Sequence, residues 1–205
     1  KGITIEQARE TLKRDLFFSG MMVRESMADG SVSGSFATTG DVTRAALFCV
    51  GLGEGMSILS SFFLMVYPEK VYSFADCAVN PNPTAEQLAD IAISTADNHK
   101  KLTGEAPYIA MLSFSTKGSA EHELVDKVRA ATNFVQQKRP DLFVDGELQF
   151  DAAIVDGIGR KKAPGSKVAG RANVLVFPDL NSGNIGYKIA QRLGGAEAVG
   201  PINQG

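Results

Sequence analysis

The sequence predicts an α/β protein, a three-layer α/β/α sandwich with a mostly parallel sheet. Apolar segments of strand length alternate along the chain with segments long enough to form helical crossovers between parallel strands. The strand segments are continuous apolar runs, such as residues 173–177, and continuous runs are typical of strands buried on both faces. Helices are therefore expected on both sides of the sheet.

Two helices are predicted at the start of the chain, over residues 4–15 and 17–28. Thr4 and Gln7 have the spacing of a capping box, in which each side chain pairs with the backbone amide of the other residue. A short strand is predicted over residues 31–36, because these residues are small and partly β-branched.

The middle of the chain alternates between helical and strand patterns. The predicted elements are a helix over 42–52, strands over 57–67 and 71–76, a helix over 84–102 and a strand over 108–114. Thr84 and Gln87 form a second capping box at the start of the long helix, and Gly104 closes that helix. Pro81 and Pro83 predict a loop before it, since each proline disfavours helix in the preceding residue.

The last third of the chain continues this alternation. It predicts a helix over residues 119–138, a short strand within 141–147, a short helix over 151–159, a strand over 172–177 and a helix over 182–193. Gly194 and Gly195 end the last helix. Residues 200–205 carry no signal for a helix or a strand.

The composition is that of an ordinary globular protein, with 205 residues, 44% hydrophobic residues and a formal net charge of -2. This length suits one large α/β domain, or one domain with part of another. The charge balance does not indicate a nucleic-acid partner, which demands a basic surface. No apolar run reaches the ~18 residues of a membrane span. The start at Lys1 and the irregular end indicate a segment of a longer protein.

The cysteines and histidines do not predict a metal site. Cys49 and Cys77 lie in apolar segments, so we expect buried, reduced thiols in a cytoplasmic protein. His99 and His122 stand among charged residues, and we expect both at the surface. No Cys-x-x-Cys pair is present, and the spacing of a zinc site is missing.

Four loops are expected at the carboxyl ends of the strands, where open parallel sheets bind ligands. The first contains Ser33, Thr38 and Thr39 and leads into a helix, so it either offers hydroxyls and amides to an anion or is an ordinary helix cap. The second, residues 76–81, combines a polar strand end with prolines and is either a rigid site loop or a tight turn.

The third loop, residues 113–119, has three serines, a threonine and a lysine before a helix. It is similar to a phosphate cradle, but it lacks the Gly-x-x-x-x-Gly-Lys-Ser/Thr spacing of a nucleotide-hydrolysing P-loop.

The fourth loop, residues 178–188, is the most informative. Asn181, Ser182 and two glycines bring backbone amides close to a ligand. Lys188 and Arg192 are four residues apart and share one helix face, so they form a candidate grip for a polyphosphate, with a solvated helix face as the alternative.

A basic loop over residues 161–167 precedes the last predicted strand. Lys162 and its neighbours either contact the phosphates of a cofactor or are simply exposed.

Several motifs resemble the phosphate acetyltransferase family, and they cover nearly the whole chain in the order in which the family has them. These motifs are residues 28–34, FADCAVNPNPTAEQLA at 74–89, MLSFSTKGSA at 111–120, DGELQFDAA at 145–153, and residues 173–205 with FPDLNSGNIGYK at 177–188.

The resemblance implies an acyltransferase that interconverts acetyl phosphate and coenzyme A (CoA) with acetyl-CoA and phosphate. In the family, the CoA thiolate attacks the acyl phosphate directly in a ternary complex, in a cleft between two α/β domains. Residues 1–205 would be the second domain with flanking pieces. Residues 1–30 are the expected helical lead-in from the first domain, 31–195 the α/β domain, and 196–205 the start of the return. The family's catalytic Ser-Arg pair and aspartate would lie beyond Gly205, so we expect residues 1–205 alone to be inactive.

The same resemblance suggests roles for the candidate residues. The acyl-phosphate end would be lined by Ser33, Thr38, Thr39, Tyr187, Asn181 and Ser182, and the phosphates of CoA would meet Lys162, Lys188 and Arg192. CoA and acetyl-CoA are then substrates, and no permanently bound cofactor is expected.

The complete enzyme is expected to be a cytoplasmic homodimer that acts on small molecules, with no nucleic-acid or membrane partner. Two alternatives stay open: an acetyl-CoA-sensing C-terminal domain of a bacterial malic enzyme, and a phosphate butyryltransferase. The acyl chain length is open because one methylene is worth only about 1–3 kcal/mol of discrimination.

Overall fold

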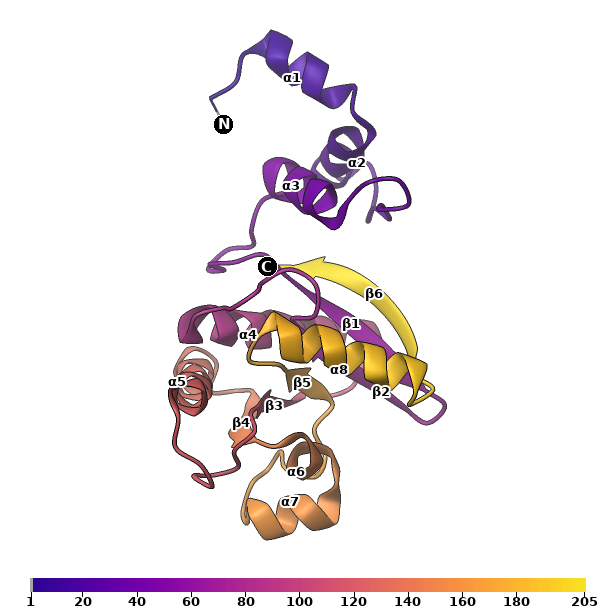
Figure 1. Cartoon of the computed structure of the whole chain (residues 1–205). Coiled ribbons are helices and arrows are strands. Elements are labelled where there is room, and N and C mark those ends of the chain that lie inside the picture. The colour runs from indigo at the N-terminus through magenta and orange to yellow at the C-terminus, as the bar shows by residue number, and fades with distance from the viewer. Residues whose placement is uncertain (1) are drawn as a thin grey trace. The chain divides into compact units, whose positions relative to one another are not determined.

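The computed structural model describes residues 2–205 and divides the chain into two compact units, with the boundary between Gly55 and Met56. The first unit contains three helices, α1 (Ile5–Leu12), α2 (Asp15–Arg24) and α3 (Thr39–Cys49). The second unit contains the sheet and the five remaining helices (Figure 1).

Helix α1 begins where the sequence predicts, whereas α2 and α3 begin two and three residues before their predicted starts. The Gln7 amide donates to Thr4 Oγ1 at 3.2 Å and the Thr4 amide donates to Gln7 Oε1 at 2.9 Å, which confirms the capping box. Phe17 and Cys49 form the buried contact between α2 and α3, with the Cys49 thiol donating to the Phe17 carbonyl.

The strand predicted over residues 31–36 is wrong. These residues have no regular structure, and the side chains of Val32 and Phe36 are fully exposed. A strand needs a partner for its backbone groups, and the described part of the first unit contains no other strand. The first compact unit ends at Gly55, and the division expected from the resemblance, after residues 30 and 195, stays a prediction.

The second unit is built on one six-stranded sheet. Its strands are β1 (Ser60–Tyr67), β2 (Lys70–Ala75), β3 (Tyr108–Leu112), β4 (Phe143–Leu148), β5 (Val174–Val176) and β6 (Glu197–Gln204), in the order β4-β3-β5-β2-β1-β6. The four strands from β4 to β2 are parallel to one another, and β1 is antiparallel to both of its neighbours. The mostly parallel sheet is confirmed.

Strand β1 runs the opposite way because only Pro68 and Glu69 connect it to β2. Two residues allow a hairpin but are too few for a parallel crossover. The register pairs Phe62 with Ala75, so the first residues of β1 lie at the carboxyl end of β2.

Strand β6 contradicts the expectation that the end of the chain has no strand. It pairs with β1, with Gln204 opposite Ser60, and Gln204 Nε2 donates to Thr95 Oγ1 at 2.7 Å. Gly200 and Pro201 weaken the local strand signal, but proline is tolerated on an edge strand such as this one.

Helices cover both faces of the sheet, which confirms the three layers (Figure 1). One core layer joins the sheet to α4 (Ala85–Thr103) and α5 (Glu123–Lys138). The other joins it to α6 (Phe150–Ile154), to the segment after α7 (Asp156–Lys162) and to α8 (Leu180–Arg192). The single helix expected over residues 151–159 is two short helices, because Val155 between them is extended.

The long helix α4 has the predicted capping box at Thr84 and a left-handed Gly104 at its end. Surface placement of His99 on this helix is wrong: its side chain is fully buried, and Nδ1 lies 2.9 Å from Ser73 Oγ. The residue shares the apolar face of α4, which the neighbouring charges obscure in the sequence. His122 is exposed as predicted and caps α5.

Both cysteines are buried, as predicted. Within residues 2–205, no helix is long and apolar enough to cross a membrane. The same residues contain no cluster of three or more His, Cys, Asp or Glu side chains that could hold a metal ion.

Candidate functional site at the carboxyl edge of the sheet

Polar side chains gather at the carboxyl edge of the parallel strands. Helix α5 follows β3 on one face and leads to β4, whereas α8 follows β5 on the other face and leads to β6 at the opposite end of the sheet. The direction of winding thus changes between the neighbouring strands β3 and β5. In open α/β sheets, ligands bind in the crevice at such a point.

The loop after β2 is organised by the buried carboxylate of Asp76. Oδ1 accepts from Ser61 Oγ at 2.8 Å and from the amides of Ala78 and Val79 at 3.0 and 3.2 Å. Oδ2 accepts from the amide and the side-chain nitrogen of Asn80 at 2.9 and 2.6 Å. Five donors and no cation surround this carboxylate among the described residues, so Asp76 shapes the loop and makes it a tight, rigid turn.

The first turn of α8 packs directly against this loop. A Cβ atom on Gly183 would lie 2.2 Å from the Asp76 carbonyl oxygen, so only glycine allows the approach. Asn184 Nδ2 donates to the Cys77 carbonyl at 3.0 Å, and the Leu180 amide donates to the Pro81 carbonyl at 3.0 Å. Gly183, one of the two glycines of the fourth predicted loop, therefore allows α8 to pack closely against the loop after β2.

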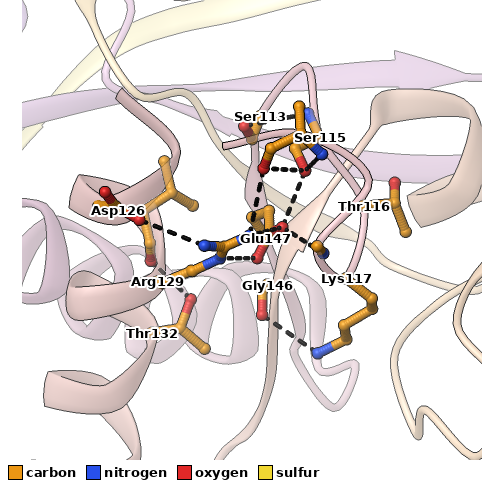
Figure 2. A network of polar contacts seen from close by, with 12 residues as sticks. Ser113, Ser115, Thr116, Lys117, Asp126, Arg129, Thr132, Gly146 and Glu147 are labelled. Atoms are coloured by element: carbon orange, nitrogen blue, oxygen red, sulfur yellow. Dashed lines mark hydrogen bonds and ion pairs between the residues drawn. The ribbon is translucent and has the colours of Figure 1, made fainter. Parts of the chain in front are cut away.

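The loop over residues 113–119 holds an internal anion, the carboxylate of Glu147 (Figure 2). Ser115 Oγ and the Gly118 amide donate to Glu147 Oε1 at 2.9 and 2.8 Å. Arg129 donates two more hydrogen bonds to this carboxylate, from Nε to Oε2 at 2.9 Å and from Nη2 to Oε1 at 3.1 Å. The Ser115 hydroxyl and the Gly118 amide of this cradle-like loop thus bind a side chain of the protein.

Glu147 is ionised in this setting. Burial by itself raises the pKa of the carboxyl, but the hydrogen bonds from Arg129, Gly118 and Ser115 outweigh burial and lower the pKa to about 2. The side chain is only 3% exposed. The network therefore joins β4 to α5 and to the loop after β3 through a buried ion pair.

Lys127 reaches from α5 to the loops that follow β2 and β5. From the second turn of α5, its Nζ donates to Asn82 Oδ1 and to the Pro178 carbonyl, both at 2.8 Å. Burial lowers the pKa of this ammonium, and the charge of Asp179 opposes that effect. Lys127 connects the loop after β2 to the start of α8, a role for which the sequence carries no signal, since most helix lysines are solvated.

Helix α8 carries five of the predicted site residues, but they do not converge. The Asp179 carboxylate caps the helix by accepting from the Ser182 amide at 2.9 Å, beside Asn181. Lys188 and Arg192 are exposed and lie about 9 and 15 Å farther along the axis than Ser182, from the rise of ~1.5 Å per residue. The cations and the helix N-terminus are therefore too far apart to bind the same phosphate, and only a ligand extended along α8 would reach both.

Tyr187, the fifth of these residues, packs onto the sheet. Its ring stacks on Phe63 of β1, with ring centroids 4.3 Å apart and planes 14° apart. Packing between α8 and β1 is thus one role of this side chain.

Lys162 belongs to a different part of the edge. Its Nζ donates to Gln149 Oε1 at 2.9 Å and to Asp151 Oδ2 at 3.0 Å, at the start of α6.

Ser33, Thr38 and Thr39 belong to the first unit. Thr38 is the N-cap of α3, where its Oγ1 accepts from the Asp41 amide at 3.2 Å. Thr39 is the exposed first residue of α3, and Ser33 Oγ lies 3.3 Å from Ser31 Oγ. The helix-cap interpretation of this loop holds for Thr38.

The whole chain, residues 1–205, matches the family model described as phosphate acetyl/butaryl transferase. The chain is 56% identical to the phosphate acetyltransferase of Thermoanaerobacterium thermosaccharolyticum, matching 100% of this chain and 64% of that protein. It is 47% identical to the phosphate acetyltransferase of Escherichia coli, matching 100% of this chain and 29% of that protein.

Among solved structures, a phosphotransacetylase from Streptococcus pyogenes superposes with a TM-score of 0.92 at 51% identity, over 98% of this chain and 62% of that one. The chain thus spans less than two thirds of the length of these relatives. With a family model that matches every residue, the chain belongs to the phosphate acetyl/butaryl transferase family.

Proposed function

We propose that the complete protein is a phosphate acetyltransferase, which converts acetyl phosphate and CoA to acetyl-CoA and phosphate and also catalyses the reverse reaction. The observation that carries this proposal is that proteins 56% and 47% identical to the whole chain bear that name. The hydrogen-bonded loops at the carboxyl edge of the sheet and the exposed cations of α8 support it.

The proposed chemistry is direct attack within a ternary complex. The CoA thiolate sulfur bonds to the acetyl carbonyl carbon, the bond from that carbon to the phosphate oxygen breaks, and phosphate leaves with the electron pair. The thiol proton passes to a base and then to the released phosphate. Negative charge moves from sulfur to phosphate, so cations and amides held near the phosphate lower the barrier. The Ser-Arg pair and aspartate expected after Gly205 stay predictions.

In this proposal, an extended CoA molecule lies along α8. Lys188 and Arg192 are about 6 Å apart along the axis and exposed, which suits contacts to separate phosphates. Lys162 would have to exchange Asp151 for a phosphate of CoA. Within the second unit, the acyl-phosphate end is assigned to Tyr187, Asn181 and Ser182, and the roles that the resemblance implies for Ser33, Thr38 and Thr39 stay predictions.

The test is an assay of thioester formation by the complete protein with acetyl phosphate and CoA. We expect wild type to form acetyl-CoA. We expect Lys188→Ala with Arg192→Ala to raise the KM for CoA about 10-fold or more, with little change in the KM for acetyl phosphate. The exposed cation Lys101 provides the control, Lys101→Ala. No thioester from the wild-type protein would refute the proposed function, and an unchanged KM for CoA would refute the cation grip alone.

Separate measurements test the acyl preference, the upstream region, the oligomeric state, the location and the activity of residues 1–205. Butyryl phosphate in the same assay decides the acyl preference, and the gene sequence upstream of residue 1 decides whether a malic-enzyme region is present. Sedimentation of the complete protein tests the homodimer, fractionation of cells tests the cytoplasmic location, and a thiol-consumption assay on residues 1–205 tests their expected inactivity.

A further inference from the structure

We propose that Lys127 is a positioning residue that holds the first turn of α8 in the geometry needed for substrate binding. The proposal rests on the proposed function for its catalytic consequence, but its structural content stands on the contacts of Lys127 alone. It acts through Pro178, Asn82 and the start of α8.

Lys127 joins two segments that are far apart in the sequence. Its ammonium donates at 2.8 Å to Asn82 Oδ1 in the loop after β2 and at 2.8 Å to the carbonyl of Pro178, the residue before the N-cap Asp179. A lysine ammonium has three donors and no acceptor, so it suits a position between two oxygen acceptors. Arginine is the only other side chain with a permanent charge and several donors.

The same two segments are also joined by hydrogen bonds from the Leu180 amide to the Pro81 carbonyl and from Asn184 Nδ2 to the Cys77 carbonyl, both at 3.0 Å. Lys127 and these bonds together fix the start of α8 against the loop that Asp76 organises. Removing the ammonium leaves the Pro178 carbonyl and the Asn82 side chain without this donor. We expect the first turn of α8 to loosen, and with it Asn181 and Ser182.

The Leu180 amide is a direct reporter of this arrangement. In the complete protein, we expect Lys127→Met to increase its hydrogen-exchange rate about 10-fold or more, because local opening becomes easier. Lys127→Arg should restore most of the protection. Asn82→Ala removes one of the two acceptors and should give a smaller increase. Lys101→Met makes the same chemical change at an exposed helix position and should leave this amide unchanged.

Kinetics give the catalytic half of the test. We expect Lys127→Met to lower kcat/KM for acetyl phosphate about 10–100-fold, since small displacements of positioning groups have effects of this size. Lys127→Arg should stay within about 5-fold of wild type. A positioning role predicts that arginine restores kcat/KM. If the loss came from lower overall stability instead, kcat/KM of each variant would decrease in step with its unfolding temperature.

Unchanged exchange of the Leu180 amide in Lys127→Met and Asn82→Ala would overturn the proposal. Equal kinetic losses in Lys127→Arg and Lys127→Met would overturn it as well, provided that the proposed function holds. If the wild-type protein forms no acetyl-CoA, the proposed function fails, and the Leu180 exchange rate alone decides whether Lys127 positions α8.

Discussion

Arg129 holds the carboxylate of Glu147 through two hydrogen bonds, Nε to Oε2 at 2.9 Å and Nη2 to Oε1 at 3.1 Å (Figure 2). The pair lies where a phosphate-binding loop was one interpretation of the sequence. The donors of that loop bind the carboxylate of Glu147 instead of a phosphate. The conformation of the loop therefore depends on the negative charge of Glu147.

Glu147→Gln should lower the free energy of unfolding by about 1.5–3 kcal/mol, the worth of hydrogen bonds to a charged group. The amide group of the new side chain carries no charge for Arg129, and its N–H groups face the donors that Glu147 accepts from, among them Arg129 Nε and the Gly118 amide. Denaturant unfolding measures the change. Glu197→Gln, an exposed carboxylate on the edge strand β6, is the matched control and should unfold like wild type. Equal stability of both variants would contradict the assigned role of Glu147.

The lowered pKa of Glu147 also predicts that the free energy of unfolding decreases at acidic pH. The pKa of Glu147 is about 2 in the folded protein, below its ordinary value of 4.5, so the unfolded chain binds the proton more readily. This contribution to stability is complete above pH ~4.5 and is lost as pH falls toward ~2. Unfolding free energies measured over this range should fall less steeply in Glu147→Gln than in wild type. Parallel curves for the two proteins would show that the carboxylate titrates normally.

His99 predicts a second pH effect, near neutrality. Burial lowers the pKa of the imidazole below its usual 6.5, and the neighbouring charge of Glu105 only partly opposes burial. The folded state therefore favours the neutral ring, and stability falls as pH drops from ~6.5 toward the lowered pKa. His99→Gln should remove this slope, whereas the exposed His122→Gln should keep it. An NMR titration that places the His99 pKa above 6.5 would rule the effect out.

Asp76→Asn tests the turn after β2. The amide nitrogen of the new side chain must face donors on Ser61, Ala78, Val79 or Asn80, so at least one donor loses its acceptor. We expect a loss of about 1–3 kcal/mol in unfolding free energy. Asp156→Asn disrupts an exposed ion pair with Arg160 and should unfold near the wild-type temperature. Similar unfolding temperatures for the two variants would refute the organising role of Asp76.

Gly183→Ala tests the approach of α8 to the same turn. The added methyl group would meet the Asp76 carbonyl oxygen at 2.2 Å, so the helix must shift, and we expect a loss of about 1–3 kcal/mol. Gly157→Ala, in helix α7, has nothing within 4 Å of the new atom and should be neutral or slightly stabilising. Calorimetric unfolding of both variants decides the point, and a stable Gly183→Ala would mean that the helix sits farther from the loop.

Features that depend on near neighbours in the chain could be predicted from the sequence. The capping boxes of Thr4 and Thr84 and the left-handed Gly104 involve residues three or four positions apart, so their spacing is visible directly. The buried strands and the three-layer architecture also followed, because continuous apolar runs separated by helices pack in few ways. Family membership followed from motifs along the whole chain.

Partnerships across the fold were decided only by the tertiary structure. The strand over residues 31–36 did not form, and β6 did, because a strand exists only where another strand accepts its backbone hydrogen bonds. The charged neighbours of His99 pointed to the surface, but the packed face of α4 placed it inside. Glu147 finds Arg129, and Lys127 finds Pro178, across separations of 18 and 51 residues that leave no local pattern. The sequence determines such contacts only through the complete fold, since they depend on which loops the sheet brings to one edge.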